Sequence, residues 1–186
     1  RSERILTDAN GRAQLLFLDG SALTVGPSSD LVIDEFVYDP ATGAGKLTMT
    51  AAKGLLRFVG GQLSKQDGAV RINTPTAGIG IRGGIAIVAI DAGGTAGGGG
   101  GRTPCEDEGT TGTLVFGRLT VESGGSGEEI TRSGFGSTAC SADEPPGAPE
   151  RQPLAELVAE FESRPGETGG LDDPPTDDDT AAAGLG

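Results

Sequence analysis

The stretch TPTAGIGIRGG, residues 74–84, contains three glycines in the spacing G-x-G-x-x-G, the last of them Gly83. This spacing is typical of a dinucleotide-binding loop when it follows a strand and opens a helix whose N-terminus holds a pyrophosphate. Here an apolar run rich in isoleucine and valine follows Gly83, and no helical period appears. Gly78 and Gly80 alternate with isoleucines, so both glycines lie on one strand face and let a neighbouring layer approach closely. The pattern therefore excludes a nucleotide site.

Side chains for other chemistry are scarce. The chain has no histidine, which excludes histidine acid–base catalysis, Ser-His and Cys-His nucleophile pairs, and histidine metal sites. The neighbouring carboxylates Asp34/Glu35 and Glu128/Glu129 would point to opposite faces of a strand, which does not suit a glycosidase pair. The acidic stretch LDDPPTDDDT lacks the register of a calcium loop and is more typical of a solvated tail. The sequence predicts no enzyme, no cofactor and no metal site.

Charge is distributed unevenly along the 186 residues. The net charge is −13, and residues 141–186 hold 12 acidic and two basic residues. This balance excludes a nucleic-acid-binding surface, which needs clustered lysine and arginine. No apolar run is long enough to span a membrane. The chain starts at Arg1 without methionine or a signal-peptide pattern, so we interpret it as a processed or partial product.

The elements that must position these residues are predicted to be strands. From residue 4 to residue 91, short β-type runs alternate with turn residues about every ten positions, which is typical of a sandwich, barrel or solenoid. We expect an all-β, sandwich- or solenoid-like body made of residues 1–91 and 113–140, joined by a glycine-rich insertion at 92–112. The expected core residues are Leu15, Phe17, Leu23, Val25, Phe36, Leu55, Phe58, Ile72, Ile79, Ile81 and Ile87.

The C-terminal region, from residue 141 onward, no longer has the strand pattern of the preceding residues. A proline-rich linker at 141–152 leads into a predicted helix at 153–163, and residues 164–186 form an extended acidic tail. The helix places apolar residues in one stripe, at i, i+3, i+4 and i+7: Leu154, Leu157, Val158 and Phe161. Because so short a helix is marginal alone in water, its stripe must dock, on its own β body or on a second copy. We expect the region after Cys140 to contact a second copy.

Several motifs together resemble the FecR-like domain family. AQLLFLDGSALTVGPSSD contains Asp19-Gly20 between two apolar strands, and KGLLRFVGG resembles a further strand of that family. TPTAGIGIRGG resembles the family's Thr-Pro-x-Ala-x-x-x-x-Arg-Gly-Thr signature, with Gly84 in place of the last threonine. The matching positions, which we expect to be structural, are Asp19, Gly20, Thr74, Pro75, Arg82 and Gly83. The resemblance covers residues 4–91 and implies a non-enzymatic, extracytoplasmic β domain.

Cys105 and Cys140 flank the second block of strands. An even pair of cysteines in a protein expected to be exported favours a disulfide over two unpaired thiols. Both cysteines lie in polar, glycine-flanked stretches, unlike the apolar surroundings of most buried thiols.

The sequence is compatible with two main functional hypotheses of different kinds and with a third that has less support. We expect an exported structural or interaction protein, periplasmic, on the cell surface or extracellular, that binds a protein partner or copies of itself in an oligomer or filament. The alternative is a periplasmic sensor or regulatory module, since the best-known FecR members resembled here regulate a sigma factor and contact an outer-membrane receptor. A carbohydrate-binding domain has the least support, because six phenylalanines and one tyrosine offer little aromatic platform.

Overall fold

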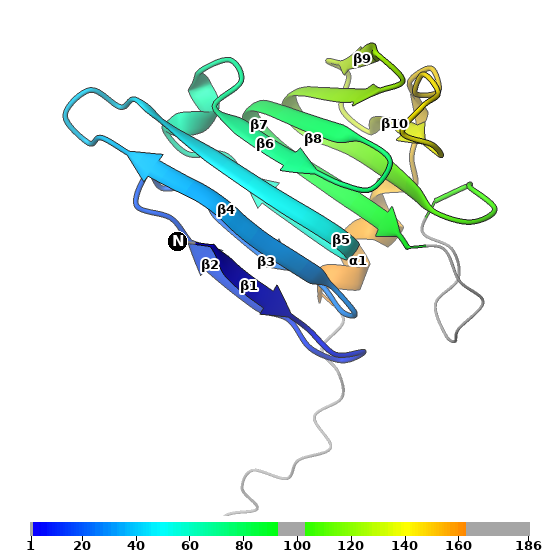
Figure 1. The fold of residues 1–186 in the computed structure, drawn as a ribbon, viewed down its shortest axis with the longest axis horizontal. Helices are drawn as coiled ribbons and strands as arrows, with labels where there is room; N and C mark the ends of the chain where they lie inside the picture. Colours follow the sequence, from blue (N-terminus) through cyan, green and yellow to red (C-terminus); the bar gives the residue numbers. More distant parts are fainter. Residues whose placement is uncertain (1, 93–102, 163–186) are drawn as a thin grey trace, which may run out of the picture.

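The structure is a computed structural model that describes residues 2–92 and 103–162. Within these residues the chain forms eleven strands, a short 3₁₀ helix and one α-helix (Figure 1). The elements are β1 (Glu3–Leu6), β2 (Ala13–Leu16), β3 (Ala22–Val25), β4 (Asp30–Tyr38), β5 (Gly45–Val59), η1 (Leu63–Lys65), β6 (Val70–Asn73), β7 (Gly78–Asp91), β8 (Gly109–Ser123), β9 (Ser126–Ile130), β10 (Phe135–Ala139), β11 (Glu150–Arg151) and α1 (Leu154–Glu162). The prediction of an all-β body with one short C-terminal helix is confirmed.

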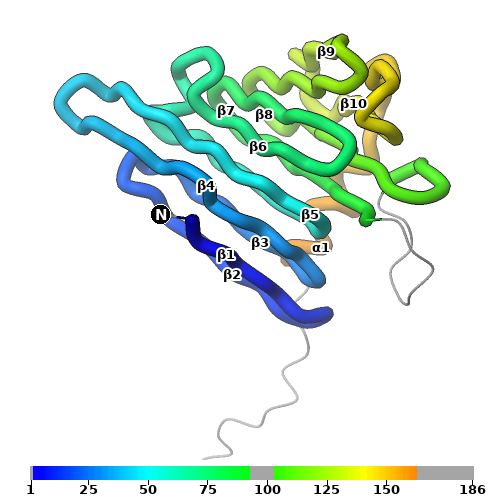
Figure 2. Tube along the Cα trace, viewed as in Figure 1, coloured from blue at the N-terminus to red at the C-terminus, as the bar shows by residue number. Residues whose placement is uncertain are grey.

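All the strands belong to one continuous, mixed sheet that folds over itself. The first half of β5 pairs with β4 and, in parallel, with β6, whereas its second half pairs with β3 and β7. β6 also pairs with the first half of β7, so each of the strands β5, β6 and β7 pairs with the other two. The first layer therefore contains β1, β4, β6 and β9 with the halves of the long strands that pair with them. The second layer contains β2, β3, β10 and β11 with the other halves. Figure 2 traces the long strands β5, β7 and β8 across the molecule.

The long strands bend where a glycine allows it. Gly84 of β7 pairs with Gly117 of β8, and their φ angles are +83° and +101°. A Cβ atom on Gly84 would overlap the Phe116 carbonyl, and one on Gly117 would overlap the Gly83 carbonyl. Only glycine combines this close approach with the left-handed backbone region. At this bulge the inward-facing positions of β7 change from odd to even numbers, so one strand contributes to both layers.

The main core lies between the two layers. Six of the expected core residues lie fully or nearly fully buried in it: Leu23, Val25, Phe58, Ile72, Ile79 and Ile81. Leu15, Phe17 and Phe36 are partly buried at its margin, with the two phenylalanine rings 5.1 Å apart. Leu55 and Ile87 are buried on the opposite face of the second layer, beneath α1. The expectation of one core was therefore wrong, because strand alternation gives β5 and β7 apolar residues on both faces.

Two expected boundaries also differ. β8 begins at Gly109, inside the expected insertion at 92–112, because the β-branched threonines at 110 and 111 continue its pairing with β7. β11 lies inside the expected linker at 141–152, where Glu150 and Arg151 pair with β10. Residues 93–102 of the insertion and the tail at 164–186 lie outside the described residues.

Candidate functional site

Asp19 joins the β2–β3 turn to the segment after β5. Its side chain, 3% exposed, accepts hydrogen bonds from the Ser21 hydroxyl at 2.6 Å and from the backbone N–H groups of Ser21 and Leu63, both at 3.1 Å. The Ser21 hydroxyl oxygen in turn accepts the Gly61 N–H at 2.9 Å. The carboxylate is thus occupied by local donors, and the Asp19-Gly20 motif holds two turns together.

Thr74 and Pro75 form the turn between β6 and β7. The Ala77 N–H donates to the Thr74 hydroxyl oxygen at 2.9 Å, and this oxygen lies 2.7 Å from the Thr110 hydroxyl of β8. Thr76 donates to the same Thr110 hydroxyl at 2.8 Å. Pro75 itself is exposed. The threonines of this motif therefore tie the turn to the start of β8.

The glycines at 78 and 83 have structural explanations as well. The Arg71 guanidinium crosses β7 over Gly78 to reach Glu122 of β8 at 2.8 Å, and a Cβ atom at position 78 would overlap it. Gly83 takes a φ of +62° at the bend of β7. Arg82, beside it, pairs with Asp67 at 2.8 Å in an exposed ion pair. The G-x-G-x-x-G stretch lies wholly within one long strand, which excludes the helix that a nucleotide loop requires.

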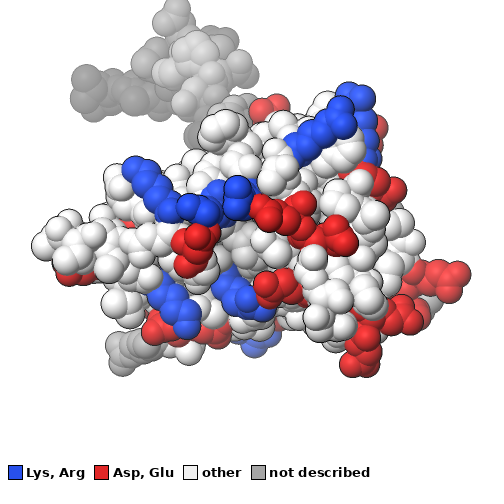
Figure 3. Space-filling view, turned by 90° about the horizontal axis from the view of Figure 1, so that it is seen from above, with Lys and Arg blue, Asp and Glu red and all other residues white. Residues whose placement is uncertain are grey.

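The outer face of the first layer is polar. Besides the Arg71–Glu122 pair, Arg118 of β8 contacts Glu129 of β9 at 2.8 Å, and Lys46 of β5 contacts Glu35 of β4 at 3.3 Å. Figure 3 views the molecule from above the orientation of Figure 1 and shows basic and acidic side chains interspersed on that side as well. The outer face of the first layer therefore offers mostly paired charges to a partner.

The predicted disulfide is present. Cys105 and Cys140 are bonded, with an S–S distance of 1.95 Å and a Cα–Cα distance of 5.5 Å. Cys105 precedes β8 and Cys140 follows β10, two strands that pair directly. The bond therefore reinforces the edge of the second layer from which the chain continues to α1.

The apolar stripe of α1 docks on the chain's own sheet. Its four residues pack against one buried cluster on the outer face of the second layer: Leu55, Ile87, Ala89 and Val115. At the other end of the helix, Arg12 donates to the Glu160 carbonyl at 2.9 Å, which suits the negative end of the helix dipole. Of the two docking surfaces expected for the stripe, the structure shows the one on the chain's own β body, where Leu55 and Ile87 supply an apolar surface.

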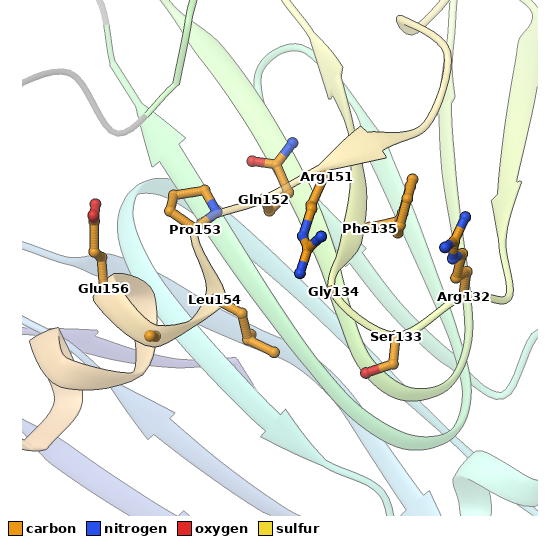
Figure 4. A pocket seen from close by; sticks show the side chains of 10 residues that line it. Arg132, Ser133, Gly134, Phe135, Arg151, Gln152, Pro153, Leu154 and Glu156 are labelled. Atoms are coloured by element: carbon orange, nitrogen blue, oxygen red, sulfur yellow. The ribbon is translucent and has the colours of Figure 1, made fainter.

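A hollow of about 510 Å³ lies where β11 meets α1. Arg132 and Phe135 line one side of it, with the guanidinium 4.4 Å from the ring centroid. Arg151 lies next to Phe135, its partner across β10 and β11, and Pro153 and Glu156 line the other side (Figure 4). Sequence reasoning missed this site, because two single arginines 19 residues apart match no motif.

The described residues carry little sign of catalysis. Among residues 2–92 and 103–162 there is no group of three or more His, Cys, Asp or Glu side chains that could hold a metal ion. Hydrogen bonds lower the pKa of Asp30, through Arg4, and of Asp39, through Thr42 and the Ala41 N–H. These partners are those of a strand pair and a turn, and neither carboxyl lines the hollow at α1.

No helix in the described part of the chain is long and apolar enough to cross a membrane. Such a helix would need about 20 apolar residues, whereas α1 has nine residues and carries three glutamates.

Comparisons with known proteins agree with the fold. Residues 3–96, just over half of the chain, match the family described as FecR protein. Two crystal structures of a proposed anti-sigma factor from Parabacteroides distasonis ATCC 8503 have similar folds, with TM-scores of 0.59 and 0.57 and 12% sequence identity.

The structural similarity extends over most of this chain but not over the whole relative. It covers 86% and 84% of this chain, and 64% and 63% of those chains. No curated protein sequence matches the chain significantly. The similarity to the crystal structures concerns the fold, and the sequence match identifies the family. The chain belongs to the FecR protein family.

Proposed function

We propose that this chain is a non-catalytic, extracytoplasmic regulatory module of the FecR signalling type, which acts by binding a protein partner. The observation that carries the proposal is the family match over residues 3–96. The fold similarity to a proposed anti-sigma factor, which includes the region after residue 96, agrees with it.

The chemistry of the chain supports a binding role. Without histidine, nucleophile–base pairs of the Ser-His and Cys-His types are excluded. The motif residues Asp19, Thr74 and Arg82 have partners within the fold and maintain its turns. The disulfide favours an oxidising compartment such as the periplasm or the cell exterior.

Self-association now has less support than a regulatory role. The sequence favours self-association because the apolar stripe of α1 needs a docking surface, and such a surface lies on the same chain. The edge strands β1 and β2 still have unpaired backbone groups on their outer sides. These edges are one surface through which copies of the chain can associate.

A genetic experiment tests the regulatory role. The gene is deleted in the native organism and restored on a plasmid, and transcripts are compared across the three strains. We expect a small set of genes to change together on deletion and to recover on complementation. Unchanged transcripts under all growth conditions tested would contradict the proposal. Light scattering on the purified full chain tests the competing idea, since a stable oligomer would favour self-assembly.

A further inference from the structure

A row of apolar side chains crosses the outer face of the second layer. The strand registers pair Leu16 with Ala22, Ala22 with Val59, Val59 with Ile85, and Ile85 with Phe116. These five residues, here called the apolar row, therefore lie side by side on β2, β3, β5, β7 and β8. Val59 and Ile85 share the face that α1 covers, since they lie four and two residues from Leu55 and Ile87 in their strands. Phe116 joins them because of a bulge in β8, where the partner of Ile85 is Phe116 and the partner of Ala86 is Leu114.

The apolar row is left uncovered. Phe116 is 70% exposed and Leu16 is 79% exposed, while the three residues between them are partly exposed. The helix packs on Leu55, Ile87, Ala89 and Val115, which lie next to the row, and stops short of it. Neighbouring strands are about 4.8 Å apart, so the row spans roughly 19 Å. A helix of about 13 residues has this length.

The arginines around the row lack carboxylate partners. Arg57 lies on the same face, two positions before Val59, and its Nε atom is buried without a hydrogen-bond acceptor in the described residues. Arg132 and Arg151 lie in the hollow near the Phe116 end of the row (Figure 4). The hollow is adjacent to the row because Ser133, which lines it, donates to the Val115 carbonyl at 2.7 Å.

The arginines elsewhere in the described sheet differ from these three. Arg4, Arg71, Arg82 and Arg118 each form an ion pair with an aspartate or glutamate. Arg57, Arg132 and Arg151 form none with the described residues, in a chain whose net charge is −13. Guanidinium groups that have no carboxylate partner and lie beside an exposed apolar surface favour a ligand that carries carboxylates.

We propose that the apolar row binds an amphipathic helix of a protein partner, with acidic residues along the flanks of its apolar stripe. This inference rests on the proposed function, because it names the chemistry of the partner. The helix α1 is the precedent, since it is itself amphipathic and acidic, with three glutamates and no basic residue, and docks on the adjacent part of this face. The row runs across the strands, whereas an added β-strand would lie along an edge.

The other occupants fit the row less well. In residues 163–186 the only large apolar side chains are Leu171 and Leu185, too few to cover five strands. The α1 stripe of a second copy is already packed against its own sheet. A helix from another protein supplies both the apolar stripe and the carboxylates.

The test uses a synthetic 13-residue stapled helix, with leucines at i, i+3, i+4 and i+7 and glutamates on both flanks, labelled with fluorescein. Fluorescence anisotropy measures its affinity for the full chain. We expect saturable binding that Phe116→Ser weakens at least tenfold.

The double variant Arg132→Ala/Arg151→Ala should weaken peptide binding several-fold and reduce its salt dependence. The matched control Val37→Ser changes an apolar residue that is 55% exposed on β4 and should leave the affinity unchanged. A peptide with lysine in place of glutamate should bind at least tenfold more weakly.

Several results would overturn the inference. One is the absence of saturable binding to the wild-type chain, and another is equal affinity for the Phe116→Ser variant. A dimer that dissociates in Phe116→Ser would assign the row to a second copy. Tighter peptide binding after deletion of residues 163–186, together with loss of amide protection along the row, would assign it to the chain's own tail. If gene deletion changes transcripts but the Phe116→Ser gene restores them fully, the inference fails while the proposed function stands.

Discussion

At the scale of single residues, Asp19 is the clearest case of a polar group that the fold requires. It is buried, and its carboxylate accepts three hydrogen bonds from the turns that it joins. Hydrogen bonds to a charged group contribute about 1.5–3 kcal/mol each, and removal of the acceptor leaves buried N–H groups without a partner. We expect Asp19→Ala to lower the free energy of unfolding by about 3 kcal/mol in urea titrations.

Asp67 provides the matched control for Asp19. Its carboxylate is 75% exposed and pairs with Arg82 on the surface. Asp67→Ala should change the free energy of unfolding by less than about 0.5–1 kcal/mol, as is usual for an exposed ion pair. Equal losses in the two variants would show that the buried position of Asp19 does not matter.

Gly83 and Gly84 separate backbone conformation from close packing. Both have positive φ angles, but a Cβ atom on Gly83 would meet nothing within 4 Å, whereas one on Gly84 would overlap the Phe116 carbonyl. Gly83→Ala should cost only the strain of the left-handed region, about 1–2 kcal/mol. Gly84→Ala should cost at least twice as much, measured by the same urea titration. A smaller loss for Gly84→Ala would mean that the bend between β7 and β8 relaxes easily.

At the scale of elements, β1 is attached to its sheet by an ion pair whose strength depends on pH. Arg4 donates two hydrogen bonds to Asp30, at 2.7 and 2.9 Å, and these lower the pKa of the Asp30 carboxyl. Because that pKa is lower in the folded chain, the pair stabilises β1 at pH values above the ordinary pKa of an aspartate. Its contribution is lost as the pH falls through the lowered pKa.

Amide hydrogen exchange as a function of pH tests the attachment of β1. We expect the β1 amides that bond to β4 to lose protection, relative to the β5 amides, as the pH falls through the pKa of Asp30. In the Arg4→Ala variant the Asp30 pKa should rise, and β1 should be weakly protected at every pH. Unaltered protection of β1 in that variant would show that its backbone pairing alone is sufficient.

The disulfide holds β8 and β10 together across a sequence separation of 35 residues. In the chain-entropy model, closing such a loop stabilises a protein by about 3–4 kcal/mol. We expect the double variant Cys105→Ser/Cys140→Ser to lose roughly this amount, and reduction of the wild-type protein to lose a similar amount. Thermal unfolding with and without a reductant measures it. The double variant itself is the control, because a reductant should not change its midpoint.

Strand identity could be predicted from the sequence because alternation of apolar residues is a local property. The runs around Leu23, Phe58 and Ile79 are strands, and Leu154–Glu162 is a helix. The layer to which each half of a long strand belongs could not be predicted. It depends on bulges at glycines such as Gly84 and Gly117 and on the register between strands that are distant in the sequence. The apolar row illustrates this limit, because its five members come from five strands.

At the scale of the whole molecule, the helix α1 divides one apolar sheet face into a covered part and an exposed part. Leu55 and Ile87 lie beneath it, and the apolar row lies beside it. The family motif points to neither part, because its residues stabilise turns and the bend of β7. The surfaces that we assign to binding therefore depend on the three-dimensional arrangement, in which one strand after another contributes a single residue.

This arrangement predicts what happens when the helix is removed. A chain that ends at residue 152 would expose Leu55, Ile87 and Ala89 next to the apolar row, which makes one continuous apolar surface across five strands. Surfaces of this kind are rarely left in water, so we expect concentration-dependent association, measured by light scattering at micromolar concentrations. A chain that ends at residue 162 keeps the helix and is the control. Light scattering should give it the same number of chains per particle as the full protein. If the shorter chain stays monomeric and folded, the face beneath α1 is not a strongly apolar surface, and the role given to the helix is wrong.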